Sequence, residues 1–332
     1  MRARLRPPAL TGSLHMFASA LAHGIVCLGC LTAVAAAAVP ADDEPLEAPV
    51  PEIARRHRLM YRFAPGQVVH YEAVHTSKLT TQKGQFAETA RNESKTRKHF
   101  RVIALAEDGS ALLELTLDRV EMAARFGEAP AVSLDTAKPD HVPPLYRGVI
   151  KTIGRPLARV RVSASGKLLD SKSLLPPEVE AEVSGLPTGR ESADDDPAKN
   201  FLVPFPAEPV AVGDEWTDSF TVSVFVTRTL TRDVKVLRKY KLESVAGGRA
   251  RIAVGTAVVT PLREPAISAQ LIQREPSGTI EFDLERGLIV SRQSTIDKTV
   301  LAPFGDDTFM HAESRLTETL VDGERVVQTR GR

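Results

Sequence analysis

Alternation between apolar and polar side chains is the main pattern of this chain from about residue 60 onward. Val69 and Tyr71 lie on one side of an extended strand, while His70 and Glu72 lie on the other. The same period of two recurs in two further stretches, residues 113–118 and 279–284. Half-buried alternation of this kind is typical of an antiparallel sheet with one solvated face. We therefore expect a mainly β fold.

Short glycine-containing breaks separate the alternating stretches, as they do in β-hairpins. Four such breaks occur, at Asp108-Gly109, Ser165-Gly166, Gly247-Gly248 and Arg286-Gly287. Helical patterns are few and short, in residues 145–153 and 176–183, each led by two prolines. These segments are expected to form one or two short helices that cap the sheet.

The order of long strand, hairpin, gap and hairpin occurs twice, beginning at Gly66 and again at Gly213. The pattern predicts a curved antiparallel sheet or half-barrel built from two units, residues 59–185 and residues 200–326. A flexible loop over residues 186–199 is expected to join them. Chance likeness between hairpin-built segments is the alternative, and whether the two units merge into one sheet stays open.

The N-terminal segment differs from everything that follows it. Three arginines precede a long uncharged apolar stretch that ends in small residues, as in an export signal. We expect residues 1–41 to be a signal peptide and residues 42–58 a disordered linker, which places the protein in the periplasm or outside the cell. An uncleaved membrane anchor is the alternative, because the apolar stretch is nearly long enough to span a bilayer.

The two cysteines, Cys27 and Cys30, both lie inside this apolar segment. Their C-x-x-C spacing suggests a redox pair or half a zinc site, but their position within the signal argues against both. Lipidation of Cys30 is a minority alternative that would anchor the protein. The chain beyond the signal has no cysteine, so its fold is expected to form without disulfides.

The near-zero net charge of the chain argues against nucleic acid as a partner. The whole chain has 43 basic and 42 acidic residues; without the three arginines of the signal, 40 basic residues face 42 acidic ones. This balance gives no electrostatic basis for nucleic-acid binding. Once the signal is cleaved, no stable membrane span is expected.

Three motifs resemble a group of uncharacterised bacterial secreted proteins. They are Tyr-Arg-Phe-Ala-Pro-Gly at residues 61–66, the segment from Val203 to Trp216, and residues 278–290. The group is a family of unknown function, so the resemblance implies an envelope or extracellular location and no activity. The expected architecture is also similar to the half-barrel of lipoprotein-carrier proteins, in which a curved sheet cradles acyl chains. That second likeness concerns topology alone.

No linear signature of a catalytic, phosphate-binding or dinucleotide-binding site occurs in the chain. His70 and His75 are five residues apart, which places them on opposite faces of a regular strand, so no metal site is expected. Asp194-Asp195-Asp196 precedes a proline as a contiguous run, whereas calcium loops need spaced carboxylates and a glycine turn. We expect no catalytic residue, no metal and no cofactor.

Basic residues and the single tryptophan give the binding candidates. Arg97 and Lys98 in the first unit and Arg238 and Lys239 in the second occupy equivalent places in the repeat. They are expected either to line a groove that attracts an anionic head group or simply to solvate the exposed face. Trp216 is expected to be a core or rim anchor, with ligand stacking as the alternative.

These features together predict an exported, non-catalytic envelope protein that holds a lipid or other apolar ligand on the concave face of its sheet. Two alternatives remain from other classes. One is a secreted hydrolase whose site is assembled from scattered residues, and the other is a structural surface protein that associates with itself. The oligomeric state is not predicted.

Overall fold

The computed structural model describes residues 55–138, 140–184, 202–227 and 230–321. The predicted signal peptide with Cys27 and Cys30, the predicted loop over residues 186–199 and the Asp194–Asp196 run lie outside these residues.

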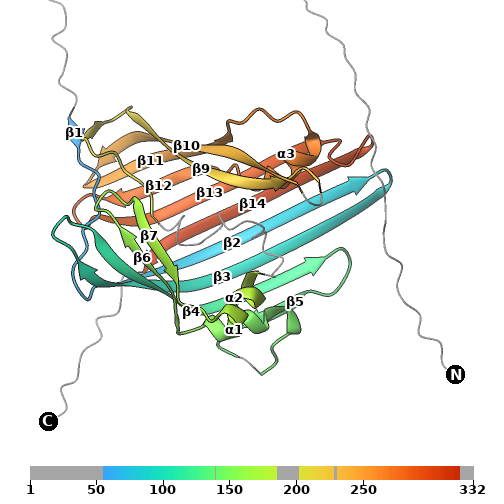
Figure 1. The fold of residues 1–332 in the computed structure, drawn as a ribbon, viewed down its shortest axis with the longest axis horizontal. Helices are drawn as coiled ribbons and strands as arrows, with labels where there is room; N and C mark the ends of the chain where they lie inside the picture. Colours follow the sequence, from blue (N-terminus) through green and yellow to red (C-terminus); the bar gives the residue numbers. More distant parts are fainter. Residues whose placement is uncertain (1–54, 139, 185–201, 228–229, 322–332) are drawn as a thin grey trace, which may run out of the picture. The chain divides into compact units, whose positions relative to one another are not determined.

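Twelve strands form one antiparallel sheet (Figure 1). Its order is β7-β6-β4-β3-β2-β14-β13-β12-β11-β10-β9, with β5 paired to β4. The strands are β2 (Val68–Lys83), β3 (Phe86–Leu105), β4 (Ala111–Phe126), β5 (Val132–Asp135), β6 (Pro156–Val162), β7 (Leu168–Ser173), β9 (Glu215–Phe225), β10 (Thr231–Ala246), β11 (Arg249–Val258), β12 (Ser277–Asp283), β13 (Leu288–Leu301) and β14 (Thr308–Val321). The mainly β antiparallel prediction is confirmed.

The local predictions from turn chemistry are also confirmed. Gly109, Gly166, Gly248 and Gly287 all have positive φ and lie in the turns that follow β3, β6, β10 and β12. The two predicted helical segments correspond to η1 (Pro144–Tyr146) with α1 (Arg147–Thr152), and to α2 (Pro177–Ser184).

A further helix, α3 (Pro265–Leu271), was not predicted. Pro265 occupies its first turn, where the missing N–H costs nothing. Ile267 and Leu271, four residues apart, point into a cluster with Val222 and Val236 of β9 and β10. Seven residues are too few to show helical periodicity clearly, so the sequence pattern does not indicate this helix.

Five strands from each predicted unit occupy the sheet in the same order. Reading across the sheet, β7-β6-β4-β3-β2 is followed by β14 and then by β13-β12-β11-β10-β9. Both runs therefore lie in one sheet, which answers the question that the sequence left open. The boundaries assigned to the two units stay a prediction.

The turns that lead into the two runs of strands have the same hydrogen-bond pattern. Gly66 N donates to Val102 O at 2.9 Å, and Gly213 N donates to Leu242 O at 2.8 Å. The return bonds, from the N–H groups of Val102 and Leu242 to the carbonyl of the residue after each glycine, are 2.9 and 3.0 Å. Both glycines have positive φ, a conformation that glycine adopts without steric cost. The repeat therefore extends to matching backbone geometry.

The sheet curls around one of its faces, here called the inner face, which carries Val69, Tyr71 and Phe100. In a flat sheet β6 and β12 would be six strand spacings apart, roughly 29 Å. Tyr61 nevertheless contacts both sides: its N–H donates to Ala164 O after β6 at 2.8 Å, and its ring lies 5.4 Å from that of Phe282 in β12. The curvature predicted from the sequence is therefore present.

Residues 59–63 and 202–205, here called the plug, fill one end of the space inside the curled sheet. Their buried side chains join the largest core cluster together with residues of β2, β3, β6, β10, β11 and β12. Val203 N donates to the hydroxyl of Tyr61 at 2.9 Å, and this hydroxyl donates to Val203 O at 3.2 Å. Burial raises the pKa of Tyr61, so the hydroxyl stays protonated and can donate.

Ordered structure begins earlier than the sequence analysis predicted. Arg56–His57 form strand β1, which pairs with β8 (Val210–Ala211) in a separate two-stranded sheet. The last residues of the predicted linker are therefore part of the fold. A strand of two residues is too short to show alternation in the sequence, and β1 forms only because its distant partner β8 pairs with it.

Candidate functional site

An apolar cavity of about 590 Å³ lies between the inner face of the sheet and helix α3. Here this space is called the apolar cavity. Its apolar lining comes from six different elements and from the segments that follow α3 and β13. The main contributors are Leu79, Met122, Phe126, Ile272, Phe304 and Met310. Flexible methionine side chains adapt to apolar ligands of irregular shape.

Helix α3 is fixed in position over the cavity by a pair of hydrogen bonds. Phe225 N donates to Gln270 Oε1 at 2.8 Å, and Gln270 Nε2 donates to Phe225 O at 2.8 Å. The amide of Gln270 therefore continues the backbone pairing at the end of β9. With Ile267 and Leu271 buried beneath it, the helix forms a rigid wall.

A few polar groups stand among the apolar ones. His75 Nε2 lies 3.0 Å from Ser314 Oγ, and burial lowers the pKa of His75, so its imidazole is neutral at pH 7. Arg274 and Glu93 are the charged residues among the described lining of the cavity, but the side chain of Glu93 points to the outer face of the sheet. A largely apolar space with a few placed polar groups is the usual form of a small-molecule binding site.

A second, smaller space of about 250 Å³, here called the arginine pocket, adjoins the apolar cavity. The two share Gln273 and Arg274. Arg238 and Arg292 also line the pocket, and its described lining includes no acidic residue. The guanidinium carbon of Arg238 lies 4.5 Å from the ring centroid of Phe220, a cation–π contact that orients the side chain.

An ion pair with a buried carboxylate and a half-buried lysine lies on the inner face beside this pocket. Glu318 of β14 is 7% exposed and its carboxylate lies 2.5 Å from Lys98 Nζ. Burial alone would raise the pKa of Glu318, but the charges of Lys98 and Arg292 outweigh it and hold the pKa below its usual value. The carboxylate is therefore ionised at neutral pH.

The four predicted basic candidates divide between the two faces of the sheet. Lys98 and Arg238 lie on the inner face, whereas Arg97 and Lys239 lie on the outer face, where they pair with Glu72 and Glu215 at 3.8 and 2.7 Å. Adjacent residues of a strand point to opposite sides. The structure therefore does not gather all four in one groove, and β3 and β10 lie six strands apart in the sheet.

Trp216 lies against the plug. Its indole Nε1 donates to Pro204 O at 2.9 Å, and its ring stacks on Tyr240 with centroids 5.5 Å apart. Neither cavity includes Trp216 in its lining. This placement agrees with an anchoring role.

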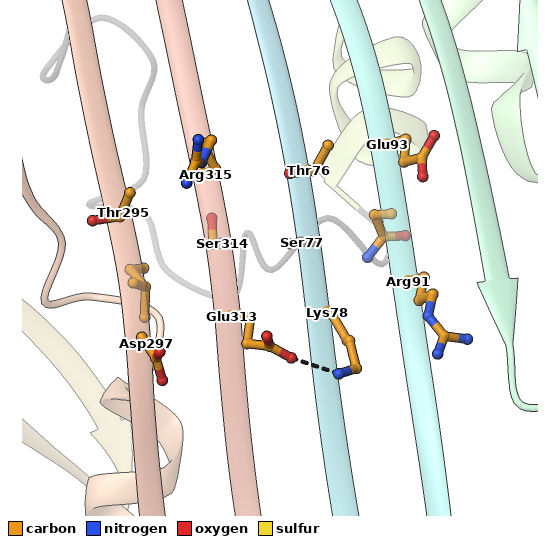
Figure 2. A pocket seen from close by; sticks show the side chains of 12 residues that line it. Thr76, Ser77, Lys78, Arg91, Glu93, Thr295, Asp297, Glu313, Ser314 and Arg315 are labelled. Carbon is orange, nitrogen blue, oxygen red and sulfur yellow. Dashed lines mark hydrogen bonds and ion pairs between the residues drawn. The ribbon is translucent and has the colours of Figure 1, made fainter.

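The outer face carries a polar groove of about 540 Å³ across β3, β2, β14 and β13 (Figure 2). Lys78 Nζ lies 2.6 Å from Glu313 Oε2 across neighbouring strands. The groove also contains Arg91 and Arg315 beside Glu93 and Asp297. Basic and acidic side chains are present in equal number, so the groove has no preference for a ligand of either charge.

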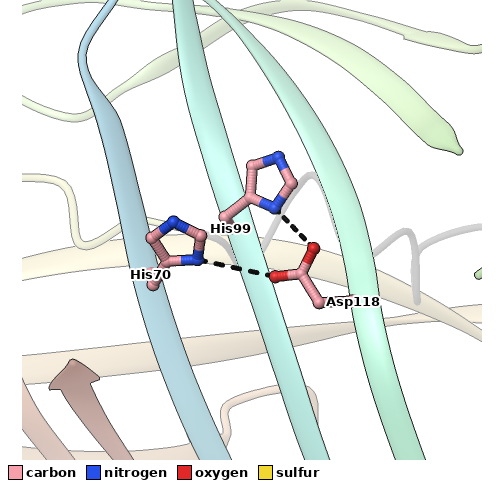
Figure 3. Close-up of side chains that lie close together, drawn as sticks. All are labelled: His70, His99 and Asp118. Atoms are coloured by element: carbon pink, nitrogen blue, oxygen red, sulfur yellow. Dashed lines mark hydrogen bonds and ion pairs between the residues drawn. The ribbon is translucent and has the colours of Figure 1, made fainter. Parts of the chain in front are cut away.

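Also on the outer face, His70, His99 and Asp118 face one another from three adjacent strands (Figure 3). His99 Nδ1 lies 2.7 Å from Asp118 Oδ1, and His70 Nδ1 lies 3.6 Å from Asp118 Oδ2. Spacing along the sequence does not indicate this cluster, because each of its three members lies on a different strand. The pairing of β2 with β3, which sets His70 opposite His99, is the signal that would have revealed it.

No helix among residues 55–138, 140–184, 202–227 and 230–321 is both long and apolar enough to cross a bilayer.

Comparison with known proteins gives likeness of fold only. No protein-family model matches the chain, and no curated protein matches it. Lipovitellin is similar over 79% of this chain, at 14% identity and a TM-score of 0.45, and the chain spans about a quarter (26%) of its length. The resemblance to an uncharacterised secreted family therefore stays a prediction from the sequence motifs.

Two other solved structures align with most of the chain. DynF of the dynemicin biosynthesis pathway of Micromonospora chersina is 7% identical over 83% of this chain and 92% of its own, with a TM-score of 0.20. A DUF1329 family protein from Desulfovibrio piger is 11% identical over 73% of this chain and 83% of its own, with a TM-score of 0.14. With TM-scores below 0.5, none of these likenesses supports a functional argument.

Proposed function

We propose that this chain is a non-catalytic binding protein of the cell envelope that holds an apolar ligand, such as the acyl chain of a lipid, in the apolar cavity. The carrying observation is the cavity itself: about 590 Å³ between the curled sheet and α3, within the range of roughly 300–1,000 Å³ that small-molecule sites occupy. The envelope location rests on the basic, apolar and small-residue order of residues 1–41.

Rigidity of the cavity walls supports binding. The sheet forms one wall of the cavity. Helix α3 forms the opposite wall and is held in place by two hydrogen bonds and by its buried apolar side chains. A preformed site loses little conformational entropy when a ligand enters. An acyl chain would replace water against Met122, Phe126 and Met310, and burial of apolar surface is the main source of affinity for such ligands.

Filling the cavity with a side chain should remove binding. Ala90 lines it from β3 and is half-buried, so in Ala90→Trp the indole would occupy the ligand's space. We expect the affinity for a fluorescent fatty acid, measured by titration, to fall at least about tenfold, or ~1.4 kcal/mol. Ala87→Trp is the matched control, because Ala87 is exposed in the same strand on the opposite face.

Equal affinity in both variants and the unmodified protein would contradict the proposed site. Extraction of the purified protein with organic solvent, followed by mass spectrometry, tests the ligand class directly. An extract without lipid, together with no binding of the fluorescent fatty acid, would contradict the proposed function as a whole. Circular dichroism of Ala90→Trp would show that the sheet is intact.

A further inference from the structure

We propose that His70, His99 and Asp118 form a binding site for a divalent transition-metal ion such as Zn²⁺. One ligand atom from each of the three side chains lies within 4.8 Å of the other two. Imidazole nitrogen and carboxylate oxygen are common zinc ligands. The site lies on the outer face of the sheet, so it is independent of the proposed ligand cavity on the inner face.

Strand pairing and one irregularity bring the three groups together. His70 of β2 is paired directly with His99 of β3. Between β3 and β4 the register shifts, because Arg97 pairs with Arg119 and Lys98 pairs with Leu117, which leaves Asp118 as the extra residue. Leu115 and Leu117 lie on the inner face, so alternation places Asp118 on the outer face with both imidazoles (Figure 3). The β-bulge leaves Asp118 without a partner residue on β3.

The distances suit a small ion after minor side-chain rotation. Zinc bonds of about 2.0–2.1 Å in tetrahedral geometry place ligand atoms roughly 3.3 Å apart. The carboxylate oxygens of Asp118 lie 2.7 Å from His99 Nδ1 and 3.6 Å from His70 Nδ1, on either side of that value. Because all three residues stand on strands, their backbone positions are fixed in advance.

One carboxylate oxygen of Asp118 is free to accept a further bond. Its Oδ2 is buried and has no hydrogen bond within the described part of the chain, although buried polar atoms are almost always satisfied. An ion between Oδ2 and the imidazoles would satisfy it. The side chains of His70, His99 and Asp118 are 35%, 18% and 26% exposed, so an ion can enter from solvent.

Besides the minor side-chain rotation, binding requires a shift of the imidazole tautomer. An ionised carboxylate can only accept, so in the metal-free state the Nδ1–H of His99 donates a hydrogen bond to Asp118 Oδ1. When the metal bonds to Nδ1, this proton moves to Nε2 and the imidazole stays neutral. Arg97, two residues from His99 in β3, would repel a cation, and Glu72 at 3.8 Å offsets only part of its charge because Lys95 shares this carboxylate at 3.0 Å.

Isothermal titration of the tag-free chain with ZnCl₂, after removal of metal by a chelator, tests the site. We expect one ion per chain, and an affinity at least about tenfold lower in both His99→Ala and Asp118→Asn, within the range of losses on removing a ligand or its support. His311→Ala is the matched control. His311 is also on the outer face and lies 3.7 Å from both Asp297 and Glu313, yet it is not part of the cluster.

Cobalt(II) provides a second measurement, because its visible absorption reports coordination by nitrogen and oxygen. Intense absorption in the unmodified chain that is lost in Asp118→Asn would support the site. No Zn²⁺ binding to the unmodified chain, or equal binding in His99→Ala and Asp118→Asn, would overturn it. Asp118→Asn and His70→Gln nearly preserve side-chain volume, so they retain the test if His99→Ala does not fold.

Discussion

Replacing Gly166 by alanine is expected to destabilise the folded protein by about 2–5 kcal/mol. Left-handed backbone at a non-glycine residue costs roughly 1–2 kcal/mol, and Gly166 has a φ of +81°. A Cβ at this position would also overlap the ring of Tyr61 and the carbonyl oxygen of Val203. Overpacking adds about 1–3 kcal/mol.

The size of the effect follows from what surrounds the glycine. Tyr61 is stacked against Phe63 and Phe205 and bonded through its hydroxyl to Val203, so its ring cannot move aside without disturbing the plug. Val203 O belongs to the backbone and is equally fixed. The hairpin turn after β6 would have to separate from the plug, which opens the largest core cluster.

Gly248→Ala is the matched control for this prediction. Gly248 has a similar φ of +76° in the turn after β10, but a Cβ there would meet nothing within 4 Å. Only the backbone cost of roughly 1–2 kcal/mol is expected. Urea unfolding followed by circular dichroism would compare the two, and equal losses would show that the plug does not press on Gly166.

Local patterns revealed most of the sheet, because alternation and turn glycines act over a few residues. The four glycine turns and the helical segments after Pro143-Pro144 and Pro176-Pro177 were predicted from such patterns. The curvature and the plug depend on contacts such as that between Tyr61 and Phe282, more than 200 residues apart. No short-range pattern reports these contacts.

The candidate sites were harder to predict than the fold for a related reason. The sequence suggests that the adjacent residues Arg97 and Lys98 could line the same groove. In the strand they point to opposite faces of the sheet. The alternation predicted for residues 113–118 is present, but the bulge that follows it, where Asp118 has no partner on β3, is not visible in the sequence. Register between strands decides which side chains meet, and the sequence alone does not reveal register.

Removing the carboxylate of Glu318 is the second change with a large expected effect. Glu318→Ala would remove the carboxylate beside Lys98 on the inner face. Breaking a buried pair costs about 3–5 kcal/mol, and we expect a loss near the lower end of this range because the Lys98 side chain is 31% exposed. Glu313→Ala on the same strand is the control: Glu313 pairs with Lys78 at 2.6 Å, but both side chains are more than 40% exposed. Solvent screens such pairs, so little change is expected.

Acidity should cancel the stabilisation that Glu318 contributes, and the sign follows from its lowered pKa. The folded protein binds this proton more weakly than the unfolded chain, whose glutamate pKa is about 4.3. The stabilisation is therefore present in full well above pH 4.3 and is lost as the pH falls through the folded pKa. In urea unfolding series, the free energy of unfolding of Glu318→Gln should lie below that of the unmodified protein at pH 7 and approach it in acid. A difference that stays constant down to acid pH would show that the loss comes from packing and that the charge of Glu318 contributes nothing.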